Sequence, residues 1–124
     1  YKKKNFIRIN GDSPLIYPEI IDKVINIHKK KTFKKYDLIT NVFPRSFPKG
    51  NSVEILKTSI LKNYLHKMSQ YESEHVTKYF YNNSSKFKIK NLRSLKDQKK
   101  TKLSVDTKDD MIKLKKLLKL KKNP

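Results

Sequence analysis

The sequence predicts an α/β fold in which helices are layered on a sheet. Short apolar stretches at 5–9, 36–43 and 52–56 have the length and composition of strands. The segment that begins at Pro18 shows the i, i+3, i+4, i+7 spacing of a helix face, with Ile21, Val24, Ile25 and His28. Strands and helices alternate along the chain, and this alternation favours a layered α/β domain. At 124 residues there is room for one domain with one modest core.

The first elements are a strand, a tight turn and a helix within residues 6–25. Gly11 permits a backbone conformation that a Cβ would resist, and Pro14 and Pro18 keep the segment between them extended. Pro18 also suits the first position of a helix. The turn places the Asp12 carboxylate at the carboxyl end of a strand, where open α/β sheets bind their ligands.

The middle of the chain is predicted to form a loop and a strand. Two prolines and a glycine in 44–51 exclude regular structure there, and a strand follows at 52–56. Glu54 lies between Val53 and Ile55, so its side chain faces away from whatever these two residues bury. The residues alone favour a solvated strand face for Glu54, and the alternative is a polar group that lines a substrate cleft.

Two helices are predicted next. Thr58 is expected to cap the first of them, and Ser73 a second one that ends at Asn82. Glu74 and His75 then lie at a helix amino end, where free N–H groups favour anionic ligands. The alternative is an ordinary helix start, in which Glu74 complements the helix dipole and His75 is partly buried.

The last third of the chain is predicted to hold two strands and a helix. Apolar and basic residues alternate in 86–92, as in a half-buried strand. A short strand is expected to end at Asp106, followed by a capping box between Thr107 and Asp110. The apolar stripe of the last helix is expected to pack on a sheet, rather than on a membrane surface, through Met111, Leu114, Leu117 and Leu118.

Charge and composition narrow the functional classes. The formal net charge is +20, but only Arg8, Arg45 and Arg93 are arginine, and lysine supplies the rest. Dedicated readers of phosphate or bases favour arginine forks, so much of this charge is expected to be compositional. The absence of cysteine excludes disulfides and thiolate metal sites. No apolar run approaches the roughly 20 residues that span a bilayer, and no signal-peptide pattern appears.

Four segments, in order, resemble one enzyme family, the cytidylyltransferases that make CMP-activated sugars. Its closest branch acts in spore-coat polysaccharide biosynthesis and is related to the CMP-Kdo and CMP-sialate synthetases. The segments are RINGDSPLI with PEIID (8–16, 18–22), FPKGNSVEI (47–55), ESEHVT followed by Tyr79 (72–77), and LSVDTKDD (103–110). The chain departs from the usual family pattern at Ser52, Ser73 and Lys108.

The resemblance implies the carboxyl-terminal half of a Rossmann-like nucleotidyltransferase of the glycosyltransferase-A type, with a mixed sheet. Residues 1–124 are then a single partial domain, and nothing in them resembles the glycine-rich nucleotide loop that the family carries near its amino terminus. The implied reaction is attack by a sugar acid on CTP, which gives a CMP-sugar and pyrophosphate for surface polysaccharide biosynthesis in the cytoplasm. The isolated chain is expected to be inactive.

The resemblance also implies roles for particular residues. Asp12 and Asp106 are expected to be catalytic and to bind Mg²⁺, a cation that prefers carboxylate oxygens and water. We expect these two carboxylates to face one another across the cleft. The residues implied for substrate binding are Arg8, Glu54, Glu74 and His75.

Two other functions stay open from the sequence. A small basic nucleic-acid-binding module would draw on the net charge and the interleaved tyrosines, although the aromatic residues follow core spacing rather than a stacking platform. A degenerate remnant of the enzyme would act only as a scaffold. Neither a specific nucleic-acid partner nor a membrane is predicted, and a homodimer is open for the full-length protein.

Overall fold

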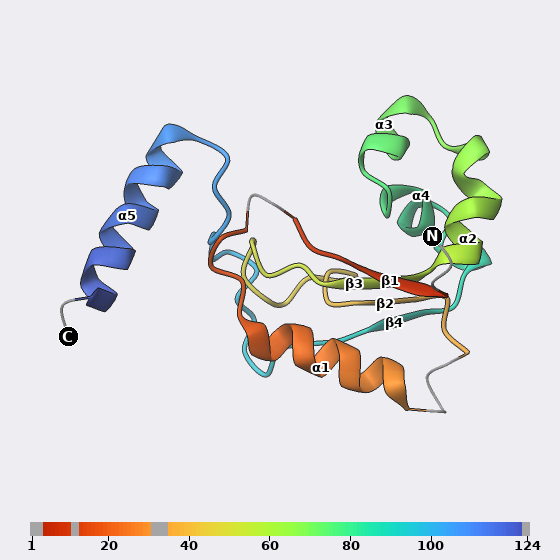
Figure 1. Cartoon of the computed structure of the whole chain (residues 1–124), viewed down its shortest axis with the longest axis horizontal. Helices are drawn as coiled ribbons and strands as arrows, with labels where there is room; N and C mark the ends of the chain where they lie inside the picture. The colour runs from red at the N-terminus through yellow and green to blue at the C-terminus, as the bar shows by residue number, and fades with distance from the viewer. Residues whose placement is uncertain (1–3, 11–12, 31–34, 123–124) are drawn as a thin grey trace.

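The computed structural model describes residues 4–10, 13–30 and 35–122, and within these ranges it contains one four-stranded mixed sheet (Figure 1). The strand order is β1-β3-β2-β4. Strand β3 is antiparallel to both of its neighbours, and β4 is parallel to β2. The strands are β1 (Asn5–Arg8), β2 (Leu38–Thr40), β3 (Glu54–Lys57) and β4 (Ile89–Asn91). The predicted mixed α/β fold is therefore confirmed.

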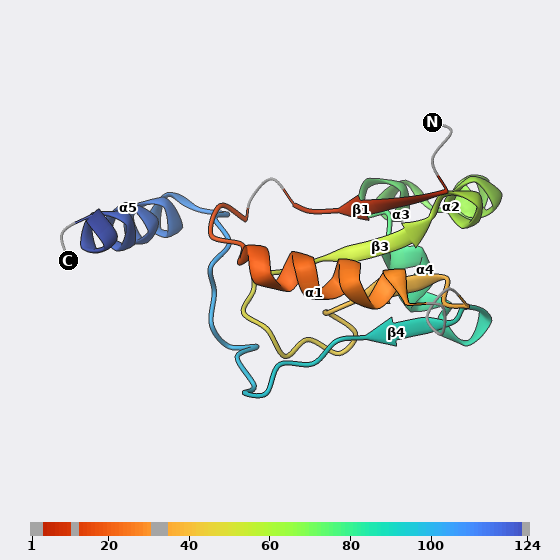
Figure 2. The same ribbon diagram turned by 60° about the horizontal axis from the view of Figure 1, so that its bottom comes forward.

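Helices cover both faces of this sheet (Figures 1 and 2). Helix α1 lies on one face, and α2 and α4 lie on the other. The α-helices are α1 (Pro18–Lys29), α2 (Thr58–Tyr64), α3 (Gln70–Glu74), α4 (Lys78–Asn82) and α5 (Lys108–Lys122). Two single turns of 3₁₀ helix, η2 (Leu65–Lys67) and η3 (Ser84–Lys86), follow α2 and α4.

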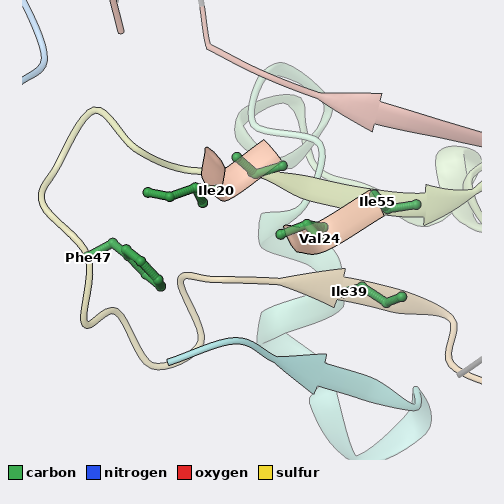
Figure 3. Packing of buried hydrophobic residues seen from close by; sticks show 6 residues of the cluster. Ile20, Val24, Ile39, Phe47 and Ile55 are labelled. Atoms are coloured by element: carbon green, nitrogen blue, oxygen red, sulfur yellow. The ribbon is translucent and has the colours of Figure 1, made fainter. Parts of the chain in front are cut away.

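The strand register sorts the core into two clusters on opposite faces of the sheet. On the α1 face, Ile20 and Val24 of the helix pack over the strands, as Figure 3 shows. Their buried partners are Ile39, Phe47, Val53 and Ile55. On the other face, one row of paired residues crosses all four strands beneath α2 and α4, namely Phe6, Leu56, Leu38 and Ile89.

The structure corrects the helix predicted after Ser73. Its start lies earlier, because Ser69 and Glu72 form a capping box in which each side chain accepts from the other residue's backbone N–H. The Ser73 hydroxyl instead donates to the carbonyl of Gln70. The helix also breaks into α3 and α4, so His75 lies in the turn between two short helices.

Two expectations about the carboxyl-terminal third are wrong. The residues just before Asp106 form no strand, and their only ladder pairing in the described part of the chain is an isolated bridge between Lys49 and Lys102. Helix α5 does not pack on the sheet but stands apart from it, at the end of the molecule away from α3 and α4 (Figures 1 and 2). Leu114 is buried, whereas more than two-fifths of the surface of Met111, Leu117 and Leu118 is exposed.

Candidate functional site

A row of polar residues lies where the strands end, on the face of the sheet that α4 covers. Arg8 ends β1, Thr40 ends β2, and Glu54 begins β3. The register pairs Glu54 with Arg8 on one side and with Thr40 on the other. Because facing residues of adjacent strands project to the same side, the three side chains lie next to one another. Tyr81 of α4 reaches this row from above.

The row forms one connected hydrogen-bond network with Glu54 at its centre. Arg8 Nη1 donates to Glu54 Oε1 at 2.9 Å, and the Tyr81 hydroxyl donates to Glu54 Oε2. The Tyr81 oxygen lies 2.8 Å from Thr40 Oγ1. Since the single phenolic proton goes to Glu54, Thr40 is the donor in that second bond. The Glu54 side chain is only 4% exposed, and both of its oxygens have partners.

Burial changes the acid–base properties of two groups in this region. It raises the pKa of the Tyr81 phenol well above its ordinary value, and the negative charge of Glu54 raises it further. Tyr81 therefore stays protonated and remains a donor to Glu54 at physiological pH. Burial also lowers the pKa of Arg45, and the charge of Glu54 partly offsets this effect.

A cleft with a volume of about 550 Å³ opens above the network. Its charged groups are mostly basic, because Arg8, Arg45 and Lys78 line it beside a single carboxylate that is already paired. Arg45 is held from below, since Nη2 donates to Ser52 Oγ at 2.9 Å and Nη1 to the Pro48 carbonyl at 3.3 Å. The remaining lining residues are Asn10, Val42, Phe43, Ser52, Glu54, His75, Thr77, Tyr81 and Asn82.

One wall of the cleft is aromatic. The ring of Phe43 stacks on that of Tyr81, with centroids 4.9 Å apart. The Phe43 backbone N–H is in turn held by the side-chain carbonyl oxygen of Asn91 at 3.0 Å. This wall fixes the Tyr81 ring and so helps to aim its hydroxyl at Glu54.

The structure brings together three of the predicted substrate-binding residues, Arg8, Glu54 and His75. Glu74, by contrast, is exposed at the end of α3 and is not among the residues that line the cleft. Sequence reasoning missed Arg45 and Tyr81. A signal for Arg45 was present, because it is one of three arginines in a chain whose other basic residues are lysine.

Asp106 lies elsewhere, two residues before α5 begins, and does not line the cleft. Its carboxylate is half exposed and contacts Lys102 Nζ at 3.3 Å. The predicted capping box next to it is confirmed, since Asp110 N donates to Thr107 Oγ1 and Thr107 N donates to Asp110 Oδ2, both at 3.1 Å. Asp12, its proposed partner in metal binding, lies outside the described residues.

Asp110 has a structural role beside Asp106. Oδ2 accepts from Lys102 Nζ at 2.9 Å and from the backbone N–H groups of Asp106 and Thr107. The bond from Lys102 is the largest of the effects that hold the pKa of Asp110 below its usual range. Asp106 makes a longer contact with Lys102 than Asp110 does and its carboxylate is half exposed, so it remains accessible to a cation.

The described residues offer few ligands for a metal ion. Across the part of the chain that the structure describes, no three His, Cys, Asp or Glu side chains gather closely enough to hold one by themselves. Magnesium, however, is commonly bound by one or two carboxylates together with water and substrate phosphates. A half-exposed Asp106 fits that requirement as one ligand.

The loop before β3 anchors the segment that leads to Asp106. Lys49 N donates to the Thr101 carbonyl at 2.8 Å, and Leu103 N donates to the Lys49 carbonyl at 2.6 Å. Gly50 adopts a φ of 98°, and a Cβ on it would lie 2.6 Å from the backbone nitrogen of Ser104. Only glycine fits both this φ and this close approach.

Comparisons with known proteins agree with this architecture. Residues 2–123 match the family described as Cytidylyltransferase. A cytidylyltransferase from Leptospira borgpetersenii serovar Hardjo-bovis superposes with a TM-score of 0.81 at 30% identity, over 90% of this chain and 47% of that one. An uncharacterized protein of Methanocaldococcus jannaschii is 32% identical over 90 residues, which are 72% of this chain and 35% of the relative.

The chain thus spans less than half the length of either relative. The match to the family nevertheless covers nearly all of the 124 residues, and the solved structure reproduces their fold. This chain belongs to the cytidylyltransferase family.

Proposed function

We propose that this chain forms the acceptor side of a cytidylyltransferase that transfers CMP from CTP to a sugar acid for surface polysaccharide biosynthesis in the cytoplasm. Membership of the family supports the use of CTP. The observation that supports a sugar acid is the excess of positive charge in the cleft, where Arg8, Arg45 and Lys78 surround one neutralised carboxylate.

The cleft has the chemistry that such an acceptor requires. A sugar acid presents one carboxylate among several hydroxyl groups. Arginine binds carboxylates through paired N–H groups, and two partly buried arginines, Arg8 and Arg45, line this cleft. Ser52, Thr77 and Asn82 offer neutral partners for hydroxyl groups. The volume of about 550 Å³ lies within the usual range for small-molecule sites.

Glu54 is assigned to positioning within this proposal. Both of its oxygens are already hydrogen-bonded, so a sugar hydroxyl would have to displace Arg8 or Tyr81 to reach it. Its contribution to substrate binding is therefore to hold Arg8 at the rim of the cleft. A fixed guanidinium loses less conformational freedom when it binds an anion than a mobile one would.

In the proposed reaction a hydroxyl oxygen of the sugar acid attacks the α-phosphorus of CTP. The new bond joins this oxygen to phosphorus, and the hydroxyl proton is released to water. The bond between the α-phosphorus and the β-phosphate oxygen breaks, and pyrophosphate leaves. We assign Asp106, together with Asp12, to the binding of Mg²⁺. When bound, Mg²⁺ would offset the charge of the phosphates and align them for displacement.

The chain's own residues have separate tasks in this scheme. Arg8 and Arg45 bind and orient the acceptor carboxylate. Tyr81, whose hydroxyl is held by Thr40, keeps the Glu54 carboxylate in place beneath Arg8. Lys102 neutralises Asp106 when no cation is bound.

A pyrophosphate-release assay tests the proposal. We would compare the 124-residue chain with a chimera in which it replaces the matching segment of the Leptospira cytidylyltransferase, using CTP, Mg²⁺ and a panel of sugar acids. We expect release from the chimera with CTP and a sugar acid, and none from the isolated chain. Equal release with a neutral sugar, or with ATP in place of CTP, would contradict the proposal.

A further inference from the structure

We propose that Asn91, at the end of β4, is a positioning residue that sets the place of the Arg45 guanidinium in the cleft. Asn91 is not among the residues that line the cleft. It acts through the turn of residues 42–45, in which Val42 and Arg45 face one another in an isolated antiparallel bridge. The inference rests on the proposed function, because it concerns how the group assigned to the acceptor carboxylate is held.

The Asn91 side chain binds this turn at two points. Its Oδ1 accepts from the Phe43 backbone N–H at 3.0 Å, and its Nδ2 donates to the Pro44 carbonyl at 3.1 Å. A side-chain amide carries an acceptor and a donor side by side, whereas an ionised aspartate would offer only acceptors. The Pro44 carbonyl belongs to the peptide group that begins Arg45. The second bond therefore fixes the direction in which Arg45 leaves the turn.

The sheet holds Asn91 itself in place. Asn91 pairs with Thr40 in the parallel register of β4 and β2, and Leu92 N donates to the Thr40 carbonyl at 2.7 Å. Thr40 Oγ1 also accepts from Val42 N at 3.2 Å. Two neighbouring strand ends thus hold the turn, and side chains fixed on strands position a site more precisely than side chains on loops.

The turn presents two residues to the cleft, Phe43 and Arg45. Phe43 stacks on Tyr81, and Arg45 donates downward to Ser52 Oγ and to the Pro48 carbonyl. These bonds occupy only part of the guanidinium fork, and its other N–H groups can serve an acceptor carboxylate. A displaced turn would move the aromatic wall and the cation together.

The chain after the turn is held separately. Ser94 N donates to Ser46 Oγ at 2.7 Å, and Gln98 N donates to the Ser46 carbonyl at 2.8 Å. These bonds fix the residue that follows Arg45. Loss of the Asn91 side chain should therefore loosen the turn without releasing the rest of the segment.

This arrangement predicts a loss of affinity without a loss of global stability. In Asn91→Ala the turn would have to be ordered when the acceptor binds. Ordering one such side chain corresponds to about a three- to tenfold weaker affinity for a sugar acid. Both bonds of Asn91 lie at the surface, so the midpoint of urea unfolding should stay close to that of the wild type.

The first test needs no ligand. Nuclear magnetic resonance would measure how fast the guanidinium protons of Arg45 exchange with water in the wild type, Asn91→Ala and Asn63→Ala. Asn63 is exposed on α2 and outside the cleft, so its variant is a matched substitution. We expect faster exchange at Arg45 in Asn91→Ala alone. The exposed Arg93 serves as a reference that exchanges rapidly in all three proteins.

The second test is a double-mutant cycle. A panel of sugar acids would be titrated into the wild type, Asn91→Ala, Arg45→Gln and the protein with both substitutions. If Asn91 acts through Arg45, its substitution weakens binding in the wild type and adds little in Arg45→Gln, because the two residues are coupled. A role in general stability would instead weaken binding equally in both backgrounds.

Two results would overturn the positioning role. One is guanidinium exchange at Arg45 that is the same in Asn91→Ala as in Asn63→Ala. The other is an equal weakening of affinity in the two backgrounds of the cycle. If the wild type binds none of the sugar acids, the proposed function fails, and the exchange of the Arg45 protons alone decides whether Asn91 positions this guanidinium.

Discussion

The cleft and the start of α5 each hold a carboxylate paired with a cation, and the two pairs have the same length. Arg8 and Glu54 lie 2.9 Å apart at the cleft, and Lys102 and Asp110 lie 2.9 Å apart beside α5. Their surroundings differ. In the pair at the cleft, Glu54 is 4% and Arg8 27% exposed, and Glu54 belongs to a network that joins three strands and α4. In the pair beside α5, Asp110 is 13% and Lys102 40% exposed.

This difference shows that distance alone does not measure the importance of an ion pair. Loss of one partner of a buried pair leaves an uncompensated charge in a poorly solvated position. Loss of an exposed partner lets water replace it, and such pairs contribute little. The account therefore predicts large effects at the cleft and small, local effects at α5.

The largest effect is expected from Glu54→Ala. It leaves Arg8 and the Tyr81 hydroxyl without their shared partner, so it should lower the free energy of unfolding by about 3 kcal/mol. This value is in the lower part of the range for buried pairs, because Arg8 is partly exposed. Urea unfolding followed by circular dichroism measures this. Glu54→Gln keeps one acceptor for Tyr81, so its free energy of unfolding should fall by less. Equal losses in the two variants would mean that packing rather than the network is responsible.

Gly50→Ala should have the next largest effect, because Gly50 lies where the loop before β3 contacts the segment that leads to α5. The φ of 98° and the contact at 2.6 Å to the Ser104 backbone leave no place for a Cβ. We expect a loss of about 2 kcal/mol in unfolding free energy. Amide exchange of Leu103, which donates to Lys49, should also become faster. Unchanged exchange at Leu103 would contradict the anchoring role of this loop.

Tyr81→Phe should cost about 1.5 kcal/mol, because it leaves one oxygen of buried Glu54 without a donor. It should also remove a pH effect. The pKa of Tyr81 is raised in the folded chain above its ordinary value of 10.0. The contribution of protonated Tyr81 to the stability of the fold is therefore complete below pH 10.0 and is lost as the pH rises beyond that value.

The measurement is the unfolding free energy of both proteins between pH 9 and 11. The wild type should lose more stability over this interval than Tyr81→Phe. Tyr71→Phe, at an exposed position, is the control and should behave like the wild type. Parallel curves for the wild type and Tyr81→Phe would contradict the raised pKa.

Asp110→Asn should produce the smallest effect, confined to α5. The pKa of Asp110 is lowered in the folded chain, chiefly by Lys102. The ionised carboxylate therefore contributes to stability at pH values above its ordinary pKa of 3.8, and this contribution is lost as the pH falls below that value. Helical content measured by circular dichroism should fall slightly, while the midpoint of global unfolding stays unchanged. A shifted midpoint would show that the cap supports more than its own helix.

The same contrast explains what the sequence could predict. The capping box at Thr107 and Asp110 was predictable because its partners lie three residues apart. The network around Glu54 joins residues separated by 46 and 27 positions, and the strand register and the packing of α4 bring them together. The alternation of Val53, Glu54 and Ile55 indicated which way Glu54 faces, but it could not show that α4 would bury it.

The error at α5 has a related cause. An apolar stripe predicts that a helix face is covered, but it carries no information about which partner covers it. The stripe was assigned to the sheet of this chain, whereas most of it is exposed. The start of α3 was missed because Ser69 and Ser73 are both plausible caps, and only Ser69 has a glutamate three residues later.

The central claim is that the cleft binds an acceptor carboxylate through Arg45. The most direct test is to titrate a sugar acid into the wild type, Arg45→Gln and Arg93→Gln and to follow binding by amide chemical shifts. Arg93 is an exposed arginine outside the cleft, so its variant has the same change in charge. The account predicts shifts around the cleft in the wild type and in Arg93→Gln, and affinity about tenfold weaker or more in Arg45→Gln. Equal weakening in the two variants, or equal binding of the neutral parent sugar, would contradict it.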